Sequence, residues 1–127
     1  MARGASCAAL LVCAWTEVFA QQAQLQCQGV MGNTPAVLSG VRRYAPYNAA
    51  GDGYVKFSGT VAAGGIRGNV AYEGYTQTAP FQGVIETPRG PLAISVLDNT
   101  GGRMIIYGGT PSLGPPQTIG EFVCRWQ

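Results

Sequence analysis

Two of the four cysteines, Cys7 and Cys13, lie in an apolar N-terminal stretch, and the other two constrain the fold more than any other feature. Once that stretch is set aside, Cys27 and Cys124 stand near the two ends of the remaining chain. A bridge between them closes a loop of about 100 residues, for which the chain-entropy estimate is about 4.7 kcal/mol of stabilisation. In an exported chain, two remaining cysteines favour a disulfide over two buried free thiols. We therefore predict a Cys27–Cys124 disulfide that links the first and last strands.

Residues 1–20 have the organisation of a secretion signal. Arg3 supplies the positive charge, residues 8–15 form an apolar run, and Ala20 offers a small residue before a cleavage site. The alternative is a membrane anchor, but a span needs about 20 apolar residues and Glu17 interrupts the stretch. We expect cleavage of residues 1–20 and a single domain over 21–127, secreted or periplasmic, with no membrane span left.

The composition indicates a β-rich domain. The chain has 19 glycines and only 11% charged residues, while hydrophobic residues make up 46%. Such a chain has enough apolar surface to fold, and its many glycines indicate frequent turns. Short apolar runs bounded by Gly and Pro predict strands. These runs are 25–30, 54–62, 66–73, 81–87, 91–97, 103–108 and 119–126.

The segment 34–44 fits two structures. Thr34 followed by Pro35 resembles a helix start, with Leu38 and Val41 at helical spacing. The same residues also alternate as a strand would, and Gly40 weakens a helix. The choice between helix and strand stays open at this point.

Three predicted strands share one pattern, in which a glycine stands between two large apolar residues at alternate positions. They contain Gly59, Gly68 and Gly83. Period-two alternation places these glycines on the apolar face, and the opposite face collects polar residues: Ser58, Thr60, Arg67, Asn69, Gln82 and Glu86. Glycine on the inner face permits close approach and tight coiling. We predict an all-β fold, a small antiparallel barrel or bent sandwich of six or seven strands in a meander.

The residue inventory argues against most catalytic classes. The chain contains no histidine, which removes the base of a Ser-His or Cys-His site and a common zinc ligand. A glycosidase-like carboxylate pair is the remaining enzymatic alternative, but Glu73 and Glu86 do not converge on the expected ladder. The net charge of +2 comes from scattered basic residues, a distribution that does not predict nucleic-acid binding. We expect no catalytic residues, no metal and no cofactor.

One segment has the composition of a contact surface. Arg42, Arg43, Tyr44, Tyr47 and Asn48 lie together in a predicted loop, and Tyr and Arg are enriched at protein-binding hot spots. The alternative is an ordinary solvated connection. Tyr72 and Tyr75 either join this end of the sheet or lie at the opposite one. We expect a non-enzymatic binding module that contacts a protein partner through loops, such as an inhibitor or envelope-associated domain. The alternative function is a barrel that holds a small apolar ligand.

Overall fold

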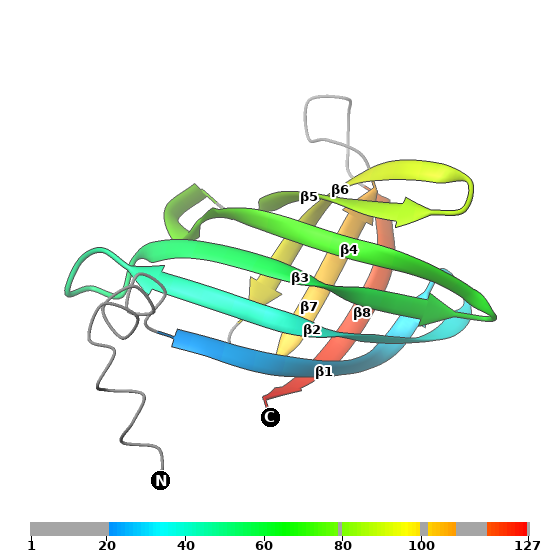
Figure 1. Ribbon diagram of the computed structural model, residues 1–127, viewed down its shortest axis with the longest axis horizontal. Helices are drawn as coiled ribbons and strands as arrows, with labels where there is room; N and C mark the ends of the chain where they lie inside the picture. The colour runs from blue at the N-terminus through cyan, green and yellow to red at the C-terminus, as the bar shows by residue number, and fades with distance from the viewer. Residues whose placement is uncertain (1–20, 79, 100–101, 109–116, 127) are drawn as a thin grey trace, which may run out of the picture.

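The chain folds into a closed antiparallel β-barrel of eight strands (Figure 1). The computed structural model describes residues 21–78, 80–99, 102–108 and 117–126. The predicted signal at 1–20 lies outside these residues. The strands are β1 (Gln21–Met31), β2 (Thr34–Pro46), β3 (Gly53–Ala63), β4 (Ile66–Tyr75), β5 (Phe81–Thr87), β6 (Gly90–Asn99), β7 (Arg103–Gly108) and β8 (Gln117–Trp126), with a 3-10 turn η2 (Thr76–Thr78) between β4 and β5. In the described ranges, no helix is both long and apolar enough to cross a membrane.

Each strand pairs with its neighbours in the sequence, and β1 pairs with β8 to close the barrel. Cys27 and Cys124 are direct cross-strand partners at this seam and form the predicted disulfide. The predictions of an all-β meander and of a bridge between its first and last strands are therefore confirmed. Of the two architectures predicted, the small barrel and the bent sandwich, the structure has the barrel.

The barrel has eight strands, against the six or seven predicted, because the ambiguous segment 34–44 adds a strand to the seven expected runs. It belongs to β2, which pairs along its length with β1 on one side and β3 on the other. The hydrogen bonds of two ladders outweigh the local helix-start signals at Thr34 and Pro35.

Side chains alternate between a buried inner face and an exposed outer face, as expected for a sheet with one solvated side. The large core side chains include Leu38, Phe57, Tyr72, Ile94, Met104, Ile106 and Phe122. The six polar residues predicted for the outer face of β3, β4 and β5 are all exposed. Ile66 departs from the predicted pattern: it stands at the first position of β4 and is also exposed.

Inner-face glycines lie where neighbouring strands come closest together. A Cβ atom on Gly59 would be 2.1 Å from the carbonyl oxygen of Ser39, and one on Gly83 would be 2.3 Å from that of Ala71. A Cβ atom on Gly40, the cross-strand partner of Gly59, would likewise be 2.4 Å from the carbonyl oxygen of Ser58. Since no side chain fits there, these glycines let the sheet coil tightly enough to close, as the repeated pattern predicted.

Candidate functional site

The five residues predicted to contact a partner do not lie on one surface. Arg43 and Tyr44 are half-buried near the end of β2, and Tyr47 and Asn48 are exposed in the following loop. Arg42 instead points into the barrel, with its side chain only 8% exposed. The expectation that Arg42 belongs to an exposed contact surface is therefore wrong. The physical reason is strand alternation: Arg42 continues the inward series of Leu38 and Gly40 along β2.

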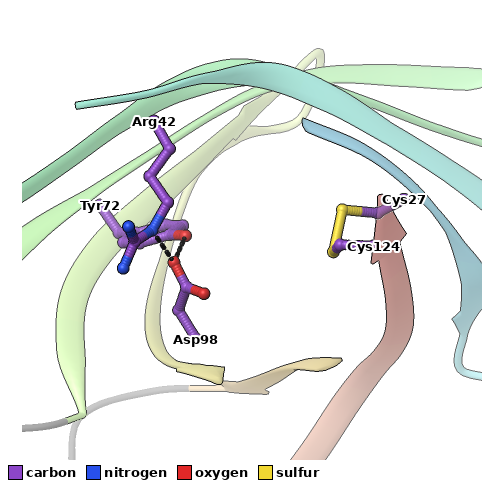
Figure 2. The surroundings of a disulfide bond; sticks show 5 residues. All are labelled: Cys27, Arg42, Tyr72, Asp98 and Cys124. Carbon is purple, nitrogen blue, oxygen red and sulfur yellow. Dashed lines mark hydrogen bonds and ion pairs between the residues drawn. A yellow bond between two sulfur atoms is a disulfide. The ribbon is translucent and has the colours of Figure 1, made fainter. Parts of the chain in front are cut away.

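Inside the barrel, Arg42 belongs to a polar cluster built from three strands (Figure 2). Its Nε donates a hydrogen bond of 2.7 Å to Oδ2 of Asp98 on β6. The hydroxyl of Tyr72 on β4 donates a second hydrogen bond, of 2.6 Å, to the same oxygen. The guanidinium carbon also lies 5.6 Å from the ring centroid of Trp126 on β8, within the range of a cation–π contact. Arg42 thus connects three distant segments at one end of the barrel.

The aromatic environment of Tyr72 keeps its phenol protonated. Its ring stacks between Phe57, at 5.0 Å between centroids, and Phe81, at 5.6 Å. Burial, followed by the negative charge of Asp98, raises the pKa of Tyr72 far above its ordinary value. The hydroxyl therefore acts as a permanent hydrogen-bond donor to Asp98. Paired and hydrogen-bonded in this way, the buried charges have a structural role in joining strands.

Two exposed tyrosines and one half-buried tyrosine gather at the same end of the barrel, where β2, β3 and β4 meet the 47–52 loop. We call Tyr47, Tyr54 and Tyr75 the tyrosine surface. The rings of Tyr54 and Tyr75 pack edge-to-face at 4.9 Å, and those of Tyr47 and Tyr75 at 6.2 Å. Tyr47 and Tyr75 are 51% and 52% exposed. Large aromatic rings are thus held against one another with half of their area open to solvent.

A hydrogen-bond network holds the loop that carries Tyr47. The Tyr47 hydroxyl donates to Oε1 of Gln77 at 2.7 Å, and Nε2 of Gln77 donates to Oδ2 of Asp52 at 3.1 Å. Asn48 and Asp52 bond twice, through Asn48 Nδ2 to Asp52 Oδ2 and through the backbone N–H of Asp52 to Asn48 Oδ1, both at 3.0 Å. The hydroxyl of Tyr44 donates to the carbonyl of Gly51. The loop is therefore ordered by its own side chains and by η2.

Desolvation and nearby carboxylates both raise the pKa of Tyr47 and of Tyr54. Desolvation and then the charge of Asp52 raise the pKa of Tyr47. Desolvation, followed by a hydrogen bond to Glu73, raises the pKa of Tyr54. Both hydroxyls are protonated; their single protons are engaged by Gln77 and by Glu73, and the oxygen lone pairs remain to accept hydrogen bonds. Arg43, near the C-terminal end of β2, lies close to these residues in the sequence. Its Nε donates a hydrogen bond of 3.1 Å to Oε1 of Gln22 on β1.

Sequence reasoning missed part of this arrangement. It did not include Tyr54, Asp52 or Gln77, although register offered a signal, because Tyr54 and Tyr75 are direct partners in the β3–β4 ladder. Of the two tyrosines left open, Tyr75 joins the tyrosine surface and Tyr72 lies inside the barrel.

The chain matches no protein-family model, no curated protein and no solved structure.

Proposed function

We propose that this chain is an exported, non-enzymatic binding module that recognises a protein partner through the tyrosine surface. The observation that carries the proposal is the half exposure of Tyr47, on a loop ordered by hydrogen bonds, and of Tyr75, at the end of β4. Tyrosine provides a large contact area with few rotors, and a contact group held in place before binding loses less entropy on association. The hydroxyl oxygens of Tyr47 and Tyr54 can also accept directional hydrogen bonds from a partner.

The proposed location is extracytoplasmic, either periplasmic or extracellular. The Cys27–Cys124 disulfide supports it, because structural disulfides persist in oxidising compartments and are rare in the cytosol. The signal-like organisation of residues 1–20 supports the same location. The proposed lack of enzymatic activity is supported by the absence of histidine from the sequence.

Crosslinking followed by capture tests the proposal. The oxidised domain, carrying a photocrosslinking residue at the exposed position Thr78 in η2, is mixed with extracytoplasmic extract from its native source. We expect one protein to crosslink in a Tyr47- and Tyr75-dependent manner, with the adduct lost in the Tyr47→Ala/Tyr75→Ala variant.

The matched control is Val123→Ala, which removes a side chain that is 67% exposed on β8 and should leave the adduct unchanged. Thermal melts of all variants establish that each one is folded. An adduct that persists in the tyrosine double variant, or that disappears equally with Val123→Ala, contradicts the proposal.

A further inference from the structure

A second candidate binding site lies on the outer wall of the barrel, towards the end opposite the tyrosine surface. It is a hollow of about 680 Å³ over β2, β3, β4, the end of β5 and the turn that follows β5. Its wall includes the C-terminal part of β3 and the N-terminal part of β4, whereas Tyr54 and Tyr75 stand at the other ends of these two strands. The two sites are therefore separate, and we call this one the wall groove.

A row of hydrogen-bonding side chains crosses the wall groove perpendicular to the strands. Ser39 pairs with Thr60, Thr60 with Asn69, and Asn69 with Glu86, in three successive ladders. Neighbouring strands are about 4.8 Å apart, so the row presents one polar group at each such step. Two hydroxyls, a carboxamide and a carboxylate follow one another across four strands.

The side chains of this row lie on the outer surface, with Ser39 half-buried and Thr60, Asn69 and Glu86 exposed. Within the described part of the chain, the side chains of Thr60, Asn69 and Glu86 make no hydrogen bond or ion pair, and Arg67, in the next row, makes none either. The groove thus offers solvent-exposed donors and acceptors side by side. Val37, Ala62 and Pro88 add small apolar contacts to its lining.

The charge of the wall groove is balanced. Arg67 is its one cation and Glu86 its one anion among the residues that line it. A polyanion such as nucleic acid is bound by several basic groups that neutralise phosphates, and that condition is not met. A neutral ligand with many groups that both donate and accept hydrogen bonds fits better.

We propose that the wall groove binds a neutral β-linked oligosaccharide that lies along the row. In an extended β-1,4-linked glycan every sugar ring presents hydroxyl groups at its edges, with alternate rings turned over, at a spacing close to the separation of adjacent strands. Each hydroxyl donates and accepts, which suits the mixture of carboxamide, carboxylate, hydroxyl and guanidinium groups. An extended peptide repeats its side chains every two residues, about 6.7 Å, and so does not match the row.

Titration with oligosaccharides, followed by two-dimensional NMR of the oxidised domain, tests this inference. The probes are cellotetraose and N-acetylchitotetraose, with glucose as the short ligand and maltotetraose as an α-linked control. We expect saturable shifts around Thr60, Asn69 and Glu86 with at least one β-linked tetrasaccharide. Glucose, which occupies a single step of the row, should bind at least about tenfold more weakly.

Variants establish which groups make the contact. Asn69→Ala and Glu86→Gln should each weaken binding by about three- to tenfold, as expected for the loss of one hydrogen-bonding group. Arg125→Ala removes an exposed arginine from β8 and should change nothing. Because Glu86→Gln conserves shape at an exposed position, it keeps the test independent of any effect of Asn69→Ala on folding.

Three results would overturn the inference. They are no shift with either β-linked tetrasaccharide at millimolar concentration, shifts centred on the tyrosine surface instead, or binding of an extended tetrapeptide at the wall groove in place of the sugars. The proposal for the tyrosine surface is tested by the crosslinking experiment alone, so the failure of one proposal does not decide the other.

Discussion

Cys27 and Cys124 stand directly opposite each other in the β1–β8 ladder, with their Cα atoms 3.9 Å apart. This is the only ladder among the eight that joins strands distant in the sequence. The one covalent crosslink of the described chain thus lies at the seam where the sheet closes.

Removal of this crosslink should lower the free energy of unfolding by about 2–5 kcal/mol, because the unfolded chain regains the freedom of a long loop. The Cys27→Ala/Cys124→Ala variant and the wild-type domain are compared by urea unfolding, each with and without a reductant. Reductant should destabilise the wild type and leave the variant unaffected. Equal midpoints for the oxidised wild type and the variant would contradict the prediction.

A methyl group at the inner face of β3 should disrupt the barrel. In Gly59→Ala the new Cβ would meet the carbonyl oxygen of Ser39 at 2.1 Å, so the backbone of β2 or β3 must move. We expect a loss of at least about 3 kcal/mol, in the range of severe overpacking. Gly108→Ala is the control, since its nearest contact is a methyl carbon of Ile119 at 3.2 Å. Urea midpoints that fall equally in the two variants would show that tight coiling does not depend on Gly59.

Removing one partner of the buried Arg42–Asp98 ion pair should lower the free energy of unfolding more than replacing both partners with uncharged residues. Arg42→Met leaves the carboxylate of Asp98 buried without its counter-ion, for which the expected loss is about 3–5 kcal/mol. Adding Asp98→Asn removes that charge and retains an oxygen to accept from Tyr72, so the double variant should be more stable than Arg42→Met alone. A double-mutant cycle measured by urea unfolding gives the coupling. Additive losses would argue against a direct Arg42–Asp98 interaction.

Tyr72 should remain protonated in alkali for as long as the barrel is folded. The unfolded tyrosine ionises near its ordinary pKa of 10.0, whereas the folded pKa is raised by burial and by Asp98. The neutral phenol therefore contributes stability that is fully present below about pH 10 and is lost progressively above it. Ultraviolet titration should show Tyr72 ionising only on unfolding. The variant Tyr72→Phe should give the same native titration amplitude as the wild type, and a smaller amplitude would contradict the assignment.

Export should remove residues 1–20. Intact-mass analysis of the protein isolated from its native source should give a chain that begins at Gln21, with the mass of one disulfide. A chain that retains Arg3, or two thiols that react with an alkylating agent in the absence of reductant, would contradict this prediction.

Local sequence was sufficient for most of the fold. The positions of two cysteines predicted the seam, and the repeated glycine pattern predicted the coiling that Gly59 and Gly83 permit. The strand 34–46 was ambiguous because its helix-start signals are local, whereas the two ladders that stabilise it are not.

The side-chain clusters were harder to predict. Arg42, Tyr72 and Asp98 come from three strands, and only closure of the barrel brings them together. Asp98 also opens the sequence Asp-Asn-Thr-Gly-Gly at 98–102. This composition indicates an exposed turn rather than a buried hydrogen-bond acceptor. Leu38, Gly40 and Arg42 stand at alternate positions of one strand, which predicts that all three face the interior. The charge of Arg42 predicted a place on the surface instead.

The meander gives the folding process an inherent order. Hairpins between consecutive strands need only short-range encounters, which form quickly, while the β1–β8 ladder needs the two ends of the domain to meet. We therefore expect the two thiols to become neighbours after the hairpins have formed, so that oxidation records completion of the barrel. Formation of the Cys27–Cys124 disulfide would then crosslink only chains whose barrel has already closed.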